Sequence, residues 1–267
     1  MTTSTAARPA SRPLPRLQRL TGSLAWLAAS YGLFILVWNI AAGTLANPVL
    51  LPSFGNTLSA FARLVGDGTL LNDVLASLQR VFIGFTIASV VAVPLAMLMS
   101  YFMVLRQLML PIVTLLRPIP PIAWIPIAIL WFGIGNEASY FITALAAFFP
   151  IFLNSFAGGL AVEPRHIHAA KFMGARRNAL LLRIFLPSAL PHIWTGLKIG
   201  LGQSWMAVVT AELVAAQSGL GYMIQVNRIN LETSAVLVGM VVIGILGSAM
   251  TAGLAWIERF VLPWQQR

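Results

Sequence analysis

The sequence predicts an all-α membrane protein with six transmembrane helices. Hydrophobic residues make up 58% of the 267 residues and charged residues only 9%, whereas soluble domains are about 25% charged. The mean hydropathy is +0.85, and a soluble globule of this length cannot bury that much apolar surface. A helix needs about 20 apolar residues to cross a hydrocarbon core about 30 Å thick, and the chain contains six runs of that length.

Four of these runs carry no charged residue, and two carry ionisable residues. The uncharged runs are residues 24–43, 81–104, 138–162 and 235–257. The other two are residues 107–133, which contain Arg117, and residues 189–215, which contain Lys198 and Glu212. Because Pro and Gly interrupt residues 47–79, we expect short amphipathic stretches there along the outer face, and we expect a tight turn over residues 133–137.

The positive charges predict the orientation. If the N-terminus lies in the cytoplasm, most Lys and Arg residues of the connecting segments also lie inside, and only Arg63 and Arg228 lie outside, with Arg80 at the edge of a span. We therefore expect both termini in the cytoplasm. Residues 1–20 are expected to form a mobile basic tail, and residues 21–267 a single transmembrane domain. The alternative for the first run is a cleaved signal peptide, but the run is longer than the usual hydrophobic region of such a peptide.

The sequence lacks the motifs of an ATPase, a metalloenzyme or a hydrolase. No G-x-x-x-x-G-K-[ST] loop occurs, so the chain has no visible means of using ATP by itself. The histidines, His166, His168 and His192, have no nearby carboxylate set that would complete a metal site, and the chain has no Cys. In a membrane protein, the net charge of +10 bears on the orientation of the chain in the bilayer and does not indicate a nucleic-acid partner. We predict no catalytic residue, no metal and no bound cofactor.

A polar, basic loop over residues 163–187 follows the fourth span. Pro164 suits the first position of a helix and Gly174 suits its end, which predicts a short helix over residues 164–173. A second helix is predicted over residues 176–185, stopped by the Leu-Pro step at residues 186–187. Two such helices below the membrane would offer a rigid surface to a partner protein. The alternative is a basic loop that lies on anionic lipid headgroups.

The spacing within this loop resembles a known motif. Ala169 and Ala170, three residues, Gly174, nine residues and then Ile-x-Leu-Pro over residues 184–187 are similar to the EAA loop of ABC importer permeases, E-A-A-x3-G-x9-I-x-L-P. Every fixed position matches except the first, where His168 stands in place of the usual Glu. Residues 116–135, 186–191 and 196–202 are similar to the sulfonate, taurine and nitrate branch of these permeases.

The resemblance implies a type I ABC importer permease in a bacterial inner membrane. Its expected partners are a second permease copy in a homodimer, two cytoplasmic ATPase subunits that carry ATP and Mg, a periplasmic substrate-binding protein, and membrane lipid. The permease itself would be non-catalytic. The expected residues of ATPase coupling are Arg165, His168, Ala169, Ala170, Met173, Gly174, Ile184, Leu186 and Pro187.

Two cations mark a candidate pathway. At 1.5 Å per residue, Arg117 and Lys198 both lie about 15 Å from the cytoplasmic face, and together they could form a positive constriction for an anion. Alternatively, Arg117 satisfies carbonyl groups freed by the neighbouring prolines, and Lys198 extends toward the cytoplasm. The other pathway candidates are Gln203, Ser204 and Glu212. Gln203 and Ser204 could equally make interhelical hydrogen bonds, and Glu212, near the outer surface, is expected to be a gate or docking residue.

The predicted function is therefore passage of a small anion, foremost an alkanesulfonate or taurine, through an ATP-driven importer. The same architecture could import nitrate, bicarbonate or another small organic solute. A secondary transporter driven by an ion gradient is a further alternative, but such proteins often contain paired inverted repeats with broken helices, and only the third span here is clearly broken by Pro.

Overall fold

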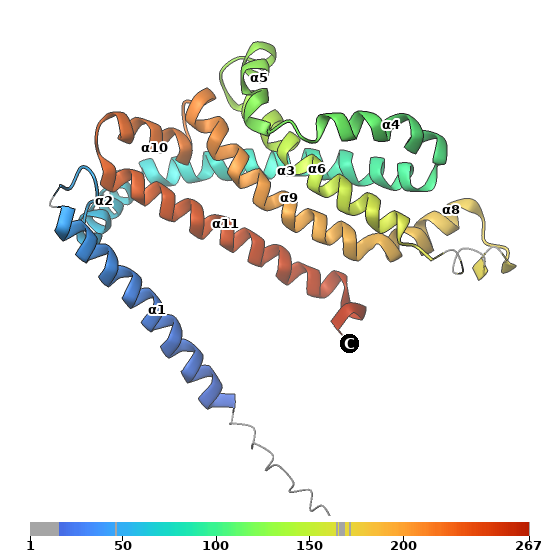
Figure 1. Cartoon of the computed structure of the whole chain (residues 1–267), viewed down its shortest axis with the longest axis horizontal. Helices are drawn as coiled ribbons and strands as arrows, with labels where there is room; N and C mark the ends of the chain where they lie inside the picture. The colour runs from blue at the N-terminus through green and yellow to red at the C-terminus, as the bar shows by residue number, and fades with distance from the viewer. Residues whose placement is uncertain (1–15, 46, 164, 166–168, 171, 267) are drawn as a thin grey trace, which may run out of the picture.

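The computed structural model describes residues 16–45, 47–163, 165, 169–170 and 172–266, and this part of the chain is helical, without a strand (Figure 1). The elements, in order, are α1 (Arg16–Leu45), α2 (Phe54–Gly66), α3 (Thr69–Tyr101), α4 (Met103–Leu116), the 3-10 helix η1 (Pro121–Trp124), α5 (Ile125–Phe132), α6 (Asn136–Leu160), α8 (Arg177–Leu180), the π-helical turn η2 (Leu181–Phe185), α9 (Leu186–Ala215), α10 (Leu220–Ile229), α11 (Thr233–Val261) and η3 (Pro263–Gln266).

The helices agree with the six predicted spans. Four of them, α1, α3, α6 and α11, are long and apolar enough to cross a membrane, and the number rises to six if each of two bent pairs forms one span. One pair is α4 with η1 and α5, bent by 91°, and the other joins α9 to α10 with a bend of 47°. Prolines at positions 118, 120 and 121 lack the N–H that a continuous helix needs, which explains the first break. As predicted, a short turn separates α5 from α6.

Small residues allow α3, α6 and α9 to pack closely at the centre of the bundle. A Cβ atom added at Gly84 of α3 would lie 2.6 Å from the Cβ atom of Thr143 in α6. A Cβ atom added at Gly200 of α9 would lie 2.7 Å from Cγ1 of Ile151, also in α6. The spacing of Gly196 and Gly200 therefore does what small residues commonly do between membrane helices, which is to bring two backbones together.

The connection between the first two spans differs from the prediction. The sequence indicated that the second span begins at residue 81, but α3 begins at Thr69 and carries Arg80 within it. The charge is tolerated because Arg80 is paired inside the protein, as described below. The predicted amphipathic stretch is α2, whose Ser53 cap accepts a hydrogen bond from the backbone N–H of Asn56 (3.2 Å) and whose buried face includes Ala60 and Leu64.

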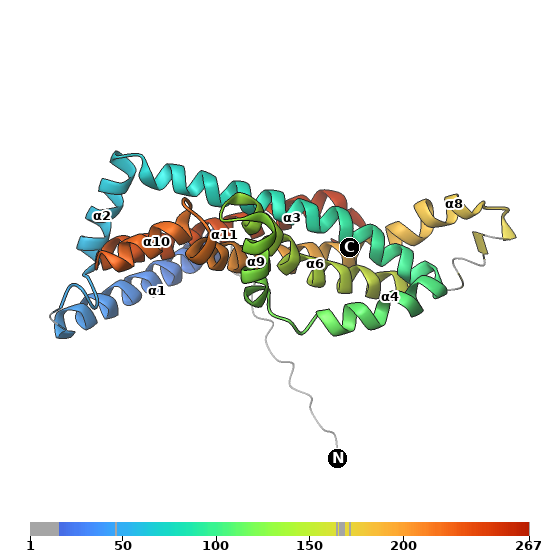
Figure 2. The same ribbon diagram turned by 90° about the horizontal axis from the view of Figure 1, so that it is seen from above.

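Helix α1 lies apart from the bundle. Figure 2 shows that α2 crosses the end of the molecule and links α1 to the start of α3. The indole N–H of Trp38 donates to the carbonyl oxygen of Pro52 (2.9 Å), and the Trp38 ring meets the Phe54 ring edge-on at 5.8 Å. The span-forming part of α1 is otherwise unburied. The predicted tail of residues 1–20 overlaps α1, which begins at Arg16, and its first 15 residues lie outside the described residues.

Candidate functional site

A buried ion pair joins α3 to α9 where α9 bends into α10. The Nη1 atom of Arg80 lies 2.7 Å from Oε1 of Glu212. Arg80 is 3% exposed and Glu212 is 1% exposed. A charge held away from water is costly unless it is paired and fully hydrogen-bonded, so the surroundings of both groups decide whether this arrangement is stable.

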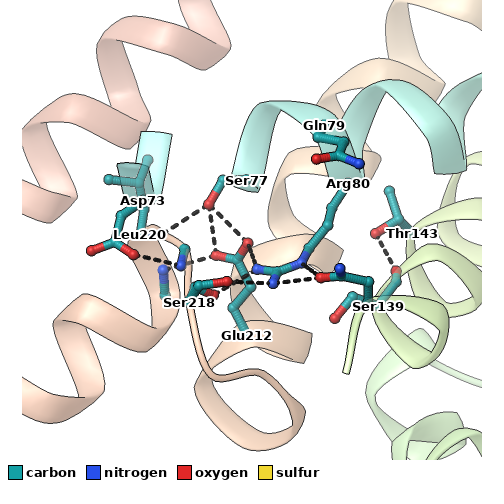
Figure 3. A network of polar contacts seen from close by, with 12 residues as sticks. Asp73, Ser77, Gln79, Arg80, Ser139, Thr143, Glu212, Ser218 and Leu220 are labelled. Carbon is teal, nitrogen blue, oxygen red and sulfur yellow. Dashed lines mark hydrogen bonds and ion pairs between the residues drawn. The ribbon is translucent and has the colours of Figure 1, made fainter. Parts of the chain in front are cut away.

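All five N–H groups of the Arg80 guanidinium are used (Figure 3). Besides Glu212, the group donates twice to Oδ1 of Asn136, the first residue of α6, at 2.9 and 2.7 Å. It also donates to the carbonyl and hydroxyl oxygens of Ser218, at 2.6 and 2.8 Å. Arginine presents its five donors in a rigid fork, and here that fork connects α3, α6, α9 and the link to α10.

The carboxylate of Glu212 caps α10 together with two side chains of α3. The first N–H groups of a helix have no partner within the helix. At the start of α10, the N–H of the preceding residue, Gly219, donates to Asp73 (2.7 Å), that of Leu220 to the hydroxyl of Ser77 (2.8 Å), and that of Gly221 to Glu212 (2.9 Å). The Ser77 hydroxyl in turn donates to Glu212 at 2.8 Å. These contacts fix the start of α10 against α3 and α9.

Glycine is required at the tip of this link. Gly219 has φ +106°, and a Cβ atom there would lie 2.4 Å from Oε1 of Glu212 and 2.6 Å from Nη1 of Arg80. Any side chain would strain the backbone and displace the ion pair. We call Asp73, Ser77, Arg80, Asn136, Glu212 and Ser218 the polar cluster. It makes the adjacent ends of four helices into one rigid unit.

The structure places Lys198 in a second ion pair. Its Nζ atom lies 2.8 Å from Oε2 of Glu258 in α11, and the two side chains are 32% and 23% exposed. Lys198 therefore does not simply extend toward the cytoplasm, because its side chain contacts Glu258. In this state the charge of Lys198 is therefore neutralised across α9 and α11.

We expect the Lys198–Glu258 pair to stabilise the α9–α11 contact by about 1 kcal/mol, between the values for exposed and buried pairs. Either Lys198→Gln or Glu258→Gln should lower the melting temperature of the purified protein by a few degrees. The exchanged variant Lys198→Glu with Glu258→Lys should recover most of the loss. If the variant with both Lys198→Gln and Glu258→Gln lost as much melting temperature as the two single variants added together, the pairing would be contradicted.

The other pathway candidates lie in different surroundings. Arg117 follows the end of α4 and is exposed, and its guanidinium has no hydrogen bond or ion pair within the described part of the chain. The hydroxyl of Ser204 is buried and donates to the carbonyl oxygen of Gly200 (3.0 Å). Gln203, one residue away, is exposed, and among the described residues its amide has no hydrogen-bond partner.

Among the five candidates, Gln203 lines an open hollow. The hollow has a volume of about 230 Å³ and lies between η1, α6 and α9. Its lining residues are Pro121, Ile122, Ile142, Ala146, Gln203, Met206, Ala207 and Thr210. The structure thus separates the five residues and does not bring Arg117 and Lys198 together within one chain.

The basic loop lies at the far end of the bundle from the polar cluster (Figure 1). Gly174 has φ +78°, and the N–H of Ala175 donates to the carbonyl oxygen of Ala170 (3.0 Å). These are features of a helix that ends at a left-handed glycine, as the sequence predicted. Phe172 and Met173 are 93% and 81% exposed, which is unusual for apolar side chains outside a lipid or protein contact.

Five of the nine coupling candidates line one hollow of about 560 Å³. Its lining residues are Ala169, Ala170, Met173, Arg183, Ile184, Pro187, Ser188 and Trp264, the last from η3 near the C-terminus. Of the other four candidates, Arg165 is exposed and pairs with Glu163, and Leu186 packs against a buried apolar cluster. Gly174 ends the helix, and His168 lies outside the described residues.

The predicted end of the second loop helix is wrong. The sequence indicated that Leu186 and Pro187 stop this helix, but α8 continues through η2 into α9, which begins at Leu186. Pro187 lies in the first turn of α9, where its missing N–H costs nothing. The backbone change is absorbed by the π-helical turn before it, whose last residue, Phe185, is buried. The loop is therefore continuous with the fifth span.

Sequence reasoning did not identify the partners in either ion pair. Hydropathy places Arg80 at the edge of a span and gives no indication that Glu258 pairs with Lys198. The available signal was the rule that ionisable residues within membrane helices usually pair with one another. That rule predicts a partner for Glu212 but does not say which of the remaining cations it is.

The long apolar helices place this chain among multi-pass α-helical membrane proteins. The described residues contain no group of three or more His, Asp or Glu that could hold a metal ion, and two cations of the spans, Arg80 and Lys198, form ion pairs between helices. The chain belongs to the family described as the inner membrane component of binding-protein-dependent transport systems, whose model matches residues 69–266. It is thus a permease of the ABC importer type.

Curated relatives agree with this assignment. The taurine transport system permease protein TauC of Escherichia coli (strain K12) is 36% identical over 255 residues, which cover 94% of this chain and 92% of that protein. The nitrate import permease protein NrtB of Leptolyngbya laminosa is 31% identical, with coverage of 76% and 74%. The putative aliphatic sulfonates transport permease protein SsuC of Bacillus subtilis (strain 168) is 28% identical, with coverage of 86% and 84%.

A solved structure shares the fold. The inward-facing MetNI methionine ABC transporter contains a chain that superposes with a TM-score of 0.65 at 22% sequence identity. The match covers 72% of this chain and 96% of that chain. The type I importer architecture expected from the EAA-like spacing is therefore the architecture found.

Proposed function

We propose that this permease forms the pathway by which an ATP-driven importer carries a small anion, foremost an alkanesulfonate or taurine, across a bacterial inner membrane. The observation that carries the proposal is the similarity to the taurine permease over 94% of the chain. Nitrate is the second candidate, because the nitrate permease NrtB is 31% identical. Both termini would lie in the cytoplasm, as the distribution of Lys and Arg favours.

The permease would act as a homodimer with two ATPase subunits and a periplasmic binding protein. ATP and Mg would be bound by the ATPase subunits, and the permease itself would be non-catalytic. The exposed Phe172 and Met173 and the hollow beside them support a docking role for the basic loop, because apolar groups at that end of the bundle need a protein or lipid contact. Continuity of the loop with α9 would pass movement of the ATPase directly to the fifth span.

Such a permease works by changing which of two packings is more stable. Closure of the ATPase pair would hold the loops in one position. Because the closed ATPases would bind one arrangement of the spans more tightly than the other, that arrangement would become the more stable one. The polar cluster would keep the ends of α3, α6, α9 and α10 together throughout. Alternating access would then arise from movement of whole units rather than from unfolding within one unit.

A substitution at Gly174 tests the coupling role of the loop. A non-Gly residue at φ +78° costs about 1–2 kcal/mol, and no atom lies within 4 Å of the added Cβ position, so the effect is on the backbone alone. We expect Gly174→Leu to reduce substrate-stimulated ATP hydrolysis by the assembled transporter about tenfold. Gly174→Asn is the matched control, because Asn adopts the left-handed conformation more readily, and it should retain most of the stimulation.

The substrate is tested separately with the wild-type complex in proteoliposomes. Uptake of taurine or ethanesulfonate that requires the binding protein and ATP would support the main proposal, and uptake of nitrate alone would replace it with the second. Wild-type coupling in Gly174→Leu would refute the role of the loop. Transport without any ATPase would refute the ATP-driven mechanism.

A further inference from the structure

The hollow beside Gln203 is formed by three separate segments near the middle of the bundle. Gln203 lies twelve residues before the end of α9, which is about 18 Å along the helix axis. The facing wall consists of Ile142 and Ala146 from α6 and of Pro121 and Ile122 from η1, which lies at the bend after α4. The hollow is thus at the depth where a solute in transit would be farthest from both aqueous phases.

The hollow offers uncharged hydrogen-bonding groups on an apolar wall. The Gln203 amide has two N–H donors, which are free within the described residues. The Thr210 hydroxyl donates to the carbonyl oxygen of Met206 (2.8 Å) and can still accept. The rest of the lining is apolar. At about 230 Å³ the hollow is smaller than the 300–1,000 Å³ of sites for drug-sized ligands.

No charged residue among those that the structure describes lines this hollow. Lys198, one helical turn or more away from Gln203 along α9, is paired with Glu258, and Arg80 is paired with Glu212. A solute in this hollow therefore meets an amide rather than an ammonium group. Passage requires binding that is strong enough to admit the solute and weak enough to release it, and uncharged donors bind an anion more weakly than cations do.

The geometry points to a transit site at Gln203 for a small solute with a compact oxyanion head and a short apolar part, such as a two-carbon sulfonate. The amide donates to the oxyanion, and the apolar part lies against Met206 and Ile142. The inference rests on the proposed function, and it names the residue that contacts the solute within the membrane.

Thiol labelling tests the site, because the chain has no Cys. In the assembled transporter, Met206→Cys places one thiol in the hollow at a position that is 68% exposed and leaves Gln203 in place. The probe is the anionic reagent 2-sulfonatoethyl methanethiosulfonate. We expect ethanesulfonate to slow its reaction at least threefold, compared with chloride at equal ionic strength. We expect this protection to disappear in Met206→Cys combined with Gln203→Leu.

Ser204→Cys is the matched control, because Ser204 is fully buried beside Gln203 and its thiol should not react. Equal rates with ethanesulfonate and chloride, or protection that survives Gln203→Leu, would overturn the transit site. Reactivity of Ser204→Cys equal to that of Met206→Cys would also overturn it. This readout does not depend on uptake, so failure of the wild-type complex to import any sulfonate would refute the proposed function and not the site.

Discussion

Arg80→Leu is expected to lower the free energy of unfolding by about 3–5 kcal/mol, because it leaves the buried carboxylate of Glu212 without its cation. The same change also removes the four hydrogen bonds that hold Asn136 and Ser218. In a chain of this size, the loss corresponds to a fall of about 10 °C in melting temperature, measured on the purified protein in detergent.

Arg63→Leu is the control for the loss of an arginine in an ion pair. Arg63 lies 2.5 Å from Glu232, but the two side chains are 57% and 45% exposed, and exposed pairs contribute at most about 1 kcal/mol. Combining Arg80→Leu with Glu212→Leu should recover part of the stability, because no unpaired charge then remains. A melting temperature of Arg80→Leu equal to that of Arg63→Leu would show that the cluster is not a structural joint.

Gly200→Leu should be the second most damaging change. An added Cβ atom at this position would lie 2.7 Å from Cγ1 of Ile151 and 3.2 Å from the backbone oxygen of Ala147. The oxygen belongs to the α6 backbone and cannot rotate away, so α6 and α9 must separate. Overpacking of this kind costs about 1–3 kcal/mol or more, and we expect a clear loss of melting temperature and of uptake.

Gly202→Leu provides a control in the same helix. No atom lies within 4 Å of a Cβ atom added at Gly202, and Leu is a better helix former than Gly by up to about 1 kcal/mol. The purified Gly202 variant should melt at or above the wild-type temperature. Equal destabilisation by both variants would mean that close packing of α9 on α6 does not depend on Gly200.

The sequence predicted the features that follow from local composition. Hydropathy gave the six spans, the prolines around position 120 gave the broken third span, and the loop spacing gave the left-handed helix end at Gly174. Each of these depends on residues close together in the chain. The error at Pro187 has the same origin, because Pro both stops a preceding helix and suits the first turn of the next, and local sequence does not choose between them.

Contacts between distant segments could not be predicted in the same way. Arg80 and Glu212 are 132 residues apart, and Lys198 and Glu258 are 60 apart. Periodicity and depth place a charged group along its own helix but do not say which helix lies beside it. For this reason the sequence could name Gln203 as a pathway candidate but could not distinguish it from Ser204. Adjacent residues of a helix point in different directions, and here Gln203 lies on an open face and Ser204 on a buried one.

The isolation of α1 has a consequence for how the protein matures. The region matched by the family begins at residue 69, the first residue of α3, and α1 packs instead on α2, which precedes that region, through the edge-on contact of Trp38 with Phe54. A helix with so few contacts to the rest of the chain is stabilised little by the segments that follow it. We therefore expect the first segment to be inserted into the bilayer without help from the spans that are synthesised after it.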